Sequence, residues 1–318
     1  MAAAERIDVH FHFIPQFFQE AAYAAGTGPA MGRYPQWSPA LALEMMDRYE
    51  IALGITSIAA PGVHFTAPDE ARALARRCND YAAELRAQWP RRFGAFATLP
   101  MHRMADAIAE ATYALDQLNF QGVCLFANYA GKFLGDPLYD PLMAALNEQN
   151  AVAFIHPALH PLTSQIDLPW PGFLMEYVFD TTRAAVNLLF SGALQRYPRI
   201  RFILAHAGGT MPYFAWRLST APMVASYLPQ LTPEQVFAGM RHFYYDNALS
   251  CGPTTMNALR TIADPERILY GSDWPFANDR VVREEVKTHT APQLHSSEQR
   301  NAIDRGNALK LWPGLTQG

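Results

Sequence analysis

The sequence predicts a closed (β/α)8 barrel, and three features of its pattern lead to this prediction. Short apolar runs recur every few tens of residues, longer stretches with helical periodicity separate them, and most of the runs lack polar–apolar alternation. Strands buried on both faces have this appearance, and strand–helix alternation is typical of parallel strands joined by crossover helices. We expect the eight strands at Arg6–Phe11, Ile55–Ala60, Phe93–Leu99, Gly122–Ala127, Ala151–His156, Arg201–His206, His242–Ala248 and Arg267–Asp273.

The stretches between these strands predict an outer layer of helices. An open doubly wound sheet is the alternative architecture, but such sheets usually have fewer strands and a glycine-rich turn after the first strand. That turn reads H-F-H-F-I-P in this chain, and no linker rich in Pro, Gly or Ser interrupts the series. We therefore expect residues 1–318 to form one domain. The helix candidates include Asp69–Trp89, Met104–Leu118, Pro141–Gln149, Glu176–Tyr197 and Pro253–Ala263.

The composition narrows the class of protein. Half of the 318 residues are hydrophobic and 17% are charged, which indicates a chain able to bury a sizeable core. The net charge of −4 and the lack of basic runs give no basis for nucleic-acid binding. Three scattered cysteines without a C-x-x-C pair favour a reducing compartment. No apolar stretch is long enough for a signal peptide or a membrane span, so we expect a cytoplasmic protein without a membrane partner.

Two segments are longer than a barrel requires. Phe13–Ser38 follows the first predicted strand and His160–Gly172 follows the fifth, so both leave carboxyl ends of strands. Barrel enzymes place their active sites at that end, and long loops without regular structure are uncommon unless they are functional. We expect these segments to act as lids; the alternative is that they are surface excursions without contact to a ligand.

Four histidines and one aspartate occur at the ends of predicted strands, which places them at one rim of the barrel. His10 and His12 end the first strand, and because residues i and i+2 face the same side, their rings should point together into the barrel mouth. His156, His206 and Asp273 end three further strands. Imidazole nitrogens with one carboxylate suit a borderline divalent ion such as Zn²⁺, with one position left open for water or substrate.

The remaining histidines are interpreted as structural residues. They fall at strand starts, in loops or on helices, where a hydrogen-bonded histidine is more common than a ligand. His160 stays undecided, because it lies only four residues after His156 and could support the site from a loop. The histidines given the structural interpretation are His64, His102, His242, His289 and His295.

Four motifs resemble the amidohydrolase superfamily. They are IDVHFH near the amino terminus, FIHP on the fifth strand, LAHAGG on the sixth and YGSDWPF on the eighth, and the resemblance runs from about Ile7 to the carboxyl terminus. More narrowly, the chain is similar to the branch containing aminocarboxymuconate-semialdehyde, γ-resorcylate and 6-methylsalicylate decarboxylases. Its sequence pattern most resembles that of the last group, in segments such as GVHF, FGAFATLP and FDTTRAAVNLLFSG.

The resemblance implies a role for each residue that matches the motifs. His206 would handle a proton beside the metal, Arg217 would grip the substrate carboxylate, in some relatives across a dimer interface, and Phe276 would line the substrate pocket. Without the motif, Arg217 would be interpreted as part of a helix-surface ion pair and Phe276 as ordinary packing. The implied metal ligands are His10, His12, His156 and Asp273.

The resemblance also implies the number of metal ions and the class of substrate. Amidohydrolases with two metals usually carry a carboxylated lysine on strand four, and Lys132 lies too far beyond that strand, so one divalent ion is expected: Zn²⁺, with Mn²⁺ or Co²⁺ as alternatives. If the substrate carried a second carboxylate, the loop after strand one would provide only Arg33 as a basic partner for it. A monocarboxylic aromatic acid with an ortho-hydroxyl group therefore fits better than a dicarboxylate, since an unpaired buried carboxylate is costly.

The expected reaction is non-oxidative decarboxylation of a 6-methylsalicylate-like acid. A proton must reach the ring carbon that bears the carboxylate, and we expect Asp273 to donate it with His206 coupled to it. Two alternatives stay open: a metal-dependent hydrolase of a lactone, amide or C–C bond that uses the same residues, and a non-enzymatic structural or sensor barrel. The resemblance suggests a homodimer, in which Glu176–Tyr197 and Met211–Leu228 are either interface or core.

Overall fold

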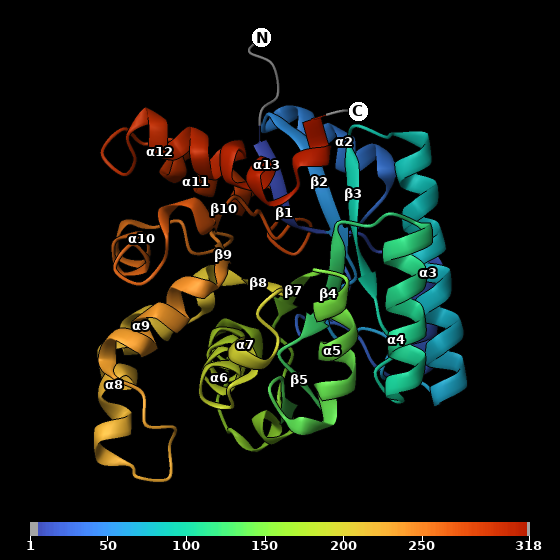
Figure 1. Cartoon of the computed structure of the whole chain (residues 1–318). Helices are drawn as coiled ribbons and strands as arrows, with labels where there is room; N and C mark the ends of the chain where they lie inside the picture. Colours follow the sequence, from blue (N-terminus) through green and yellow to red (C-terminus); the bar gives the residue numbers. More distant parts are fainter. Residues whose placement is uncertain (1–5, 317–318) are drawn as a thin grey trace.

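The computed structural model describes residues 6–316, and these form eight parallel strands surrounded by helices (Figure 1). The two ends of the sheet meet through backbone hydrogen bonds, from Val9 N–H to Tyr270 O at 3.0 Å and from His12 N–H to Trp274 O at 2.8 Å. The predicted (β/α)8 barrel is therefore confirmed. In sheet order the strands are β1 (Arg6–His12), β2 (Ile51–Ser57), β3 (Phe93–Thr98), β4 (Gly122–Phe126), β7 (Val152–His156), β8 (Arg201–Leu204), β9 (Tyr244–Asp246) and β10 (Ile268–Leu269).

Several predicted strand ends were wrong, including those of the seventh strand, which spans Tyr244–Asp246 and not the predicted His242–Ala248. The second strand begins at Ile51 and ends at Ser57, ahead of the predicted Ile55–Ala60. The sixth and eighth strands stop before His206 and Asp273, which lie in turns. Both residues have positive φ, 55° and 56°, a conformation that is incompatible with extended backbone.

Helices pack around the strands, and each predicted helix is present, with changed ends. The stretch Glu176–Tyr197 breaks at Gly192, whose φ of 76° cannot continue a right-handed helix. Residues Tyr113–Gln117 continue α4 as a π-helical turn. The helices are α1 (Gln16–Ala24), α2 (Pro39–Arg48), α3 (Pro68–Gln88), α4 (Met104–Thr112), α5 (Asp140–Glu148), α6 (Glu176–Phe190), α7 (Ala193–Arg196), α8 (Met211–Val224), α9 (Pro233–His242), α10 (Pro253–Leu259), α11 (Asp279–His289), α12 (Ser297–Asn301) and α13 (Asn307–Leu311).

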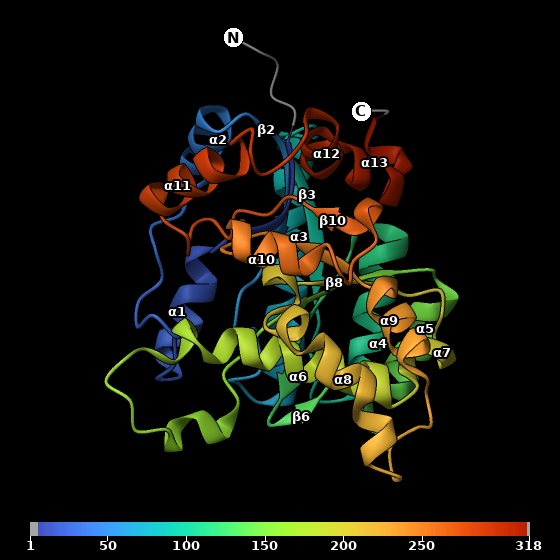
Figure 2. The same cartoon turned by 90° about the vertical axis from the view of Figure 1, so that its left-hand side faces the viewer.

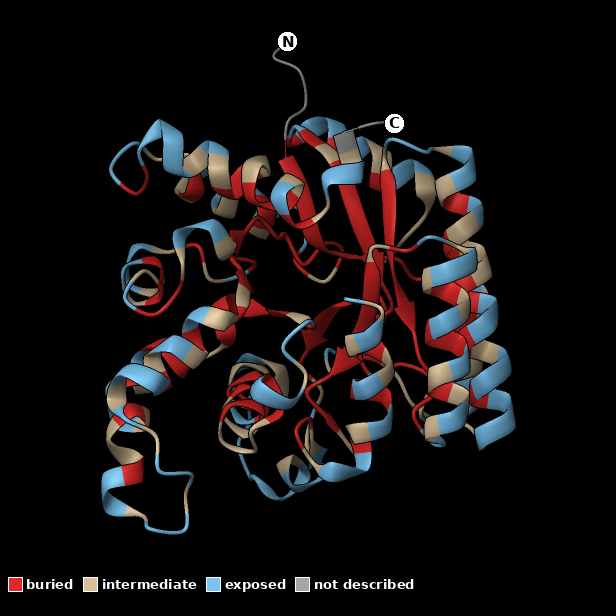
Figure 3. Cartoon of the chain, viewed as in Figure 1, coloured by how far each residue is buried: buried red, intermediate tan, exposed pale blue. Residues whose placement is uncertain are grey.

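Two apolar clusters hold this arrangement together. The larger one lies between the strands and the helices, whose outer faces are exposed (Figure 3). The smaller one includes Ile7, Phe96 and Phe154 from the strands, together with Leu311 of α13. Filling of the barrel interior by such side chains is typical of the fold, and it leaves the carboxyl ends of the strands for polar groups.

Two parts of the chain project from the body of the molecule. They are the segment from Leu159 to Met175, which contains short 3₁₀ turns, and the end of α8 with the loop that follows it (Figure 2). The segment Phe13–Ser38 is not wholly irregular as expected, because it contains α1. Within residues 6–316, the length and hydropathy of the helices rule out a helical membrane crossing.

Candidate metal centre

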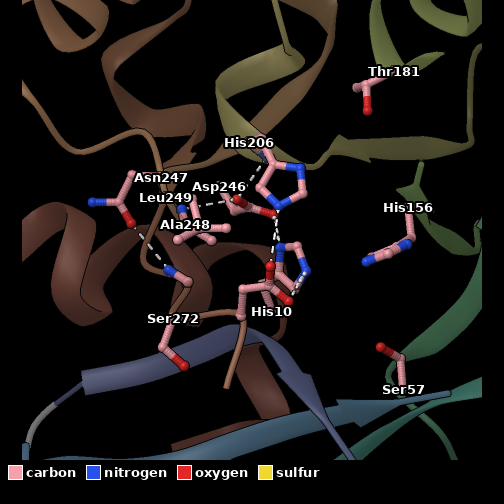
Figure 4. Close-up of polar contacts among 12 residues, drawn as sticks. His10, Ser57, His156, Thr181, His206, Asp246, Asn247, Ala248, Leu249 and Ser272 are labelled. Atoms are coloured by element: carbon pink, nitrogen blue, oxygen red, sulfur yellow. Dashed lines mark hydrogen bonds and ion pairs between the residues drawn. The ribbon is translucent and has the colours of Figure 1, made fainter. Parts of the chain in front are cut away.

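Three histidines and one aspartate converge at the carboxyl ends of the strands. His10 and His12 lie on β1, His156 is the last residue of β7, and Asp273 lies in the turn after β10. One nitrogen or oxygen atom from each side chain lies within 4.8 Å of the other three, and all four residues are buried. Figure 4 shows His156 pointing toward the group around His10 and His206.

The shortest distances within this group join β1 to the turn after β10. The Nε2 atoms of His10 and His12 lie 3.1 Å apart. Asp273 Oδ1 lies 3.0 Å from Nε2 of His12 and 3.3 Å from Nε2 of His10. The side chains of His10 and His12, two residues apart on β1, therefore point to the same side of the strand. There they lie next to the carboxylate of Asp273, which is near the carboxyl-terminal end of the chain.

The outer nitrogen of each ring is held by an oxygen atom of the protein. In a neutral imidazole, an Nδ1–H that donates a hydrogen bond leaves Nε2 without a proton. Three lone pairs and a carboxylate oxygen thus face one small space, and only a cation or a proton can relieve their repulsion. This donor set fits one borderline divalent ion. The outer partners are Asp246 Oδ2 for His10 (2.9 Å), Ser57 O for His12 (3.2 Å) and Pro157 O for His156 (2.7 Å).

Asp246 is a site residue that the sequence reasoning missed. Besides holding His10, its Oδ1 accepts hydrogen bonds at 3.0 Å from the backbone N–H groups of His206 and Ala248. It is the last residue of β9 and lies two residues before the end of the predicted strand His242–Ala248, so its position near a strand end was an available signal. Asp246 therefore fixes both a ring of the cluster and the turn that carries His206.

His206 lies beside the cluster on an unusual turn. Its Nε2 is 3.4 Å from Asp273 Oδ2, and its buried Nδ1 has no hydrogen-bond partner among residues 6–316. The backbone from His206 to Gly209 stays at positive φ, between 55° and 73°. Such strained backbone occurs at functional sites where the surrounding structure holds it.

Asp273 is held in place by the backbone of β1. Its N–H donates to His10 O at 2.8 Å. Asp8, a second buried carboxylate that sequence reasoning missed, accepts hydrogen bonds from the N–H groups of His10 (3.0 Å) and Ser272 (3.1 Å). The turn that carries Asp273 is thus fastened to β1 on both sides.

Burial and charge set the protonation of the cluster. Burial lowers the pKa of His12, and it lowers that of His156 well below its ordinary value, with neighbouring imidazoles acting in the same direction. Burial also opposes charge on His10, but Asp246 and Asp273 outweigh it and raise its pKa to about 10. Burial would raise the pKa of Asp273, yet His10 and the other imidazoles hold it well below its usual range. Without a metal ion, the site therefore stabilises one proton among neutral rings and an ionised carboxylate.

A mostly apolar cavity of about 470 Å³ opens onto His156, His206 and Asp273. Phe276 lines it, and its ring meets that of His12 edge-to-face with centroids 5.2 Å apart. No lysine or arginine contributes to the lining described by the structure. The other lining residues are Pro29, Ala30, Met31, Ala59, Ala60, Phe173, Leu174, Tyr177, Val178, Leu249, Ser250, Ala277, Asn278 and Val281.

The two long loops contribute unequally to this cavity. Residues 29–31 of the segment Phe13–Ser38 line it. The segment His160–Gly172 does not, although Phe173 and Leu174, which follow it directly, do. The first segment thus forms part of the cavity wall. The predicted second segment ends one residue before the residues that line the cavity.

Three basic residues considered from the sequence lie outside the cluster. Arg217 is exposed on α8 and does not line the cavity of its own chain. Lys132 is exposed and pairs with Asp136 at 3.6 Å, away from the metal cluster. Arg33 is exposed and does not line the cavity.

The remaining histidines are held by contacts outside the cluster. His160 caps a 3₁₀ turn by accepting the N–H of Leu162, and its ring stacks on Phe133 with centroids 5.3 Å apart. His289 pairs with Asp304 at 2.8 Å. None of His64, His102, His160, His242, His289 and His295 belongs to the cluster of possible ligands found in the described chain.

A barrel that gathers imidazoles and a carboxylate at the carboxyl ends of its strands belongs to the class of barrel enzymes whose catalytic groups lie at that end. The amidohydrolase family matches residues 7–314, nearly the whole length. The chain belongs to the amidohydrolase family. The resemblance inferred from the four sequence motifs is thereby confirmed.

The relatives within this family include several decarboxylases. The chain is 37% identical to the 6-methylsalicylic acid decarboxylase of Penicillium expansum, over 98% of this chain and 97% of that protein. It is 29% identical to the γ-resorcylate decarboxylase of Rhizobium radiobacter, over 85% of each. The crystal structure of 2,6-dihydroxybenzoate decarboxylase in complex with 2,6-dihydroxybenzoate matches with a TM-score of 0.82 and 25% identity, covering 98% of this chain and all of that one. The chain is thus an enzyme of the decarboxylase branch.

Proposed function

We propose that this protein, acting as one domain, is a metal-dependent, non-oxidative decarboxylase of small ortho-hydroxybenzoates such as 6-methylsalicylate. One observation carries the proposal: the cluster of three histidines and Asp273 opens onto a mostly apolar cavity whose lining, among residues 6–316, contains no lysine or arginine. A ring of modest size fits such a cavity, and its single carboxylate would need the metal for neutralisation. The 6-methylsalicylic acid decarboxylase of Penicillium expansum supports the substrate class.

The proposed cofactor is one divalent ion, Zn²⁺ in the first instance, with Mn²⁺ or Co²⁺ as alternatives. His10, His12, His156 and Asp273 would hold it, because their inner atoms face one another while their outer nitrogens are occupied. When bound, such an ion supplies an electrophilic template for the phenolate and carboxylate oxygens of the acid.

The protein must supply a proton to the ring carbon that bears the carboxylate. We assign the donation to Asp273 with His206 coupled to it, because their side chains lie 3.4 Å apart at the cavity. As the proton adds to the ring carbon, the C–C bond to the carboxylate breaks, CO₂ leaves and the electron pair restores the aromatic ring. The imidazoles hold the pKa of Asp273 well below its usual range, so Asp273 must receive a proton before it can donate one, and we assign its delivery to His206, the neighbour at 3.4 Å. Phe276 would pack against the ring of the acid and orient it.

Arg217 would act on the site of a second copy of this chain in a homodimer. The proposal rests on the surface around it: Tyr213 and Trp216 of α8 are 85% and 73% exposed, and Met223 and Val224 continue the apolar surface. Large exposed apolar patches favour protein contacts. Association through α8 would cover these side chains and bring the guanidinium toward a cavity to which the described part of the chain contributes no lysine or arginine.

The test is CO₂ release from salicylate, 6-methylsalicylate and 2,6-dihydroxybenzoate. Protein reconstituted with Zn²⁺, Mn²⁺ or Co²⁺ is compared with chelator-treated protein, and the products are analysed after reaction in D₂O. We expect metal-dependent CO₂ release and one deuterium at the ring position that carried the carboxylate, since that carbon receives a solvent-derived proton.

The same assay separates the decarboxylase from a hydrolase. Turnover of aryl lactones or amides with ¹⁸O incorporation from labelled water, without CO₂ release from any hydroxybenzoate, would replace the proposal by hydrolysis. Full activity of an Asp273→Ala variant that retains its metal would remove Asp273 from the chemistry.

A further inference from the structure

A second cavity of about 290 Å³ adjoins the cavity at the metal cluster. Three residues line both cavities: Ala30, Ala60 and Tyr177. The first two have side chains of a single carbon, so Tyr177 is the only large side chain among the shared residues. The two spaces are therefore neighbours whose common wall depends mainly on one phenol ring.

Several polar groups around the second cavity are already bound to the protein. The Asn128 amide donates to Asp180 Oδ1 at 2.9 Å and accepts from Gly131 N–H at 3.1 Å. The Tyr129 hydroxyl accepts from Phe126 N–H at 2.9 Å. The Nε2 of His64 accepts the N–H of Met101 at 3.1 Å, whereas its buried Nδ1 has no hydrogen-bond partner among residues 6–316.

The surface that is left for a ligand is consequently mostly apolar. It comes from Phe126, Ala158, Leu159 and the shared alanines, together with carbon atoms of the aromatic residues. Its lining includes no Lys, Arg, Asp or Glu among residues 6–316. Apart from the unpartnered Nδ1 of His64, a hydrocarbon group could be buried there against carbon atoms and polar groups that already have partners.

The ring of Tyr177 packs beside the metal cluster. It meets the ring of His156 edge-to-face, with centroids 6.0 Å apart. Tyr177 lies in the first turn of α6, where its carbonyl accepts a hydrogen bond from Thr181 Oγ1 at 3.2 Å. A substituent that extends from a substrate ring bound at the cluster toward the second cavity therefore meets the ring of Tyr177 first.

We infer that the second cavity is a subsite for an apolar ring substituent of the substrate, and that Tyr177 sets how long this substituent can be. The inference rests on the proposed decarboxylase function and narrows its substrate class. With Tyr177 in place the enzyme accepts short substituents such as methyl, and without it alkyl chains reach the second cavity.

The test compares salicylates that carry methyl, propyl or pentyl chains at ring positions 4, 5 or 6. The proteins are the parent, Tyr177→Ala, Tyr177→Phe as the matched control that keeps the ring, and Tyr177→Ala combined with Ala158→Leu, which refills the second cavity. For at least one position, we expect Tyr177→Ala to raise the propyl-to-methyl ratio of kcat/KM on the order of tenfold, because two further methylenes become buried. Tyr177→Phe should keep the parent ratio, and Ala158→Leu should cancel the gain.

A binding measurement keeps this inference separate from the proposed reaction. The dissociation constants of correspondingly alkylated 2-nitrophenols, in which a nitro group replaces the carboxylate, are measured with the metal-loaded proteins by calorimetry. The same order of preference supports the subsite even if no salicylate releases CO₂, an outcome that would contradict only the decarboxylase proposal. Equal chain-length preferences of parent and Tyr177→Ala, with metal content and thermal unfolding preserved, would overturn the subsite.

Discussion

At the scale of single residues, Asp246 connects strand β9 to two histidines. One carboxylate oxygen holds the ring of His10 at 2.9 Å and the other holds the backbone of His206 at 3.0 Å. An amide in this place would offer a donor to one of these groups and lose the charge that fixes the ring orientation. Outer partners of this kind commonly contribute a factor of about 10 to 100 to metal affinity.

We therefore expect Asp246→Asn to weaken metal binding by about 10 to 100-fold, as measured by competition with a chelating dye. The matched control is Asp304→Asn, because Asp304 pairs with a buried histidine, His289 at 2.8 Å, that lies outside the metal cluster. The control should lower thermal stability with unchanged metal affinity. Equal metal affinities of parent and Asp246→Asn would show that Asp246 does not position the ligand.

The contrast between Asp273 and Asp246 shows how much of the site the sequence can predict. The histidines and Asp273 could be found from the sequence for two reasons. They are residue types that bind metals and they stand at the ends of apolar runs, and they belong to recurrent motifs. Asp246 also follows an apolar run, but its role depends on the distance to His10, which lies 236 positions away. Local pattern carries no information on such a contact.

At the scale of elements, the turn that carries His206 depends on a close approach to α6. A Cβ on Gly209 would lie 2.0 Å from Val178 O, and φ at this glycine is +66°. Neither the backbone conformation nor the space is suited to a side chain.

Gly209→Ala should therefore lower the free energy of unfolding by about 3 kcal/mol or more, measured by urea titration. Gly306→Ala serves as the control, since Gly306 has helical φ of −57° and its Cβ would meet only Asn301 O at 3.6 Å. That change should be neutral or stabilising by up to about 1 kcal/mol. A Gly209→Ala variant as stable as the parent would contradict the packing of this turn.

Elements were predictable where one signal dominated over a long stretch. The helix from Pro68 to Gln88 differs from its predicted range by one residue at each end. By contrast, α1 escaped prediction because it lies in a stretch rich in Gly, Pro and aromatic residues. The break before α7 depends on the left-handed conformation of Gly192, which helical periodicity does not reveal.

At the scale of the whole molecule, Glu285 makes stability depend on pH. Burial raises its pKa from 4.5 to about 8, and its Oε1 accepts the N–H of Leu249. The folded state therefore binds a proton that the unfolded state has released between these values, so this group lowers stability as pH rises through the window, by at most about 1.4 kcal/mol per pH unit. Glu285→Gln should flatten the slope of the unfolding free energy between pH 5 and 8. The exposed Glu284→Gln should leave the slope unchanged, and a slope equally steep in Glu285→Gln would refute the assignment.

The proposed dimer can be tested by mixing two inactive variants. Arg217→Ala leaves its own metal cluster intact, whereas Asp273→Asn keeps Arg217 but lacks the proton donor. If Arg217 serves the partner's cavity, each mixed dimer has one complete site, and random exchange of subunits should restore about a quarter of the parent activity. Sedimentation velocity verifies the exchange, and Trp216→Glu, which places a charge in the exposed surface of α8, should yield monomers and prevent the rescue. Mixed dimers without regained activity would show that Arg217 does not complete the neighbouring site. If Arg217 served its own subunit, one site of each mixed dimer would lack Arg217 and the other would lack Asp273, so neither site would be complete.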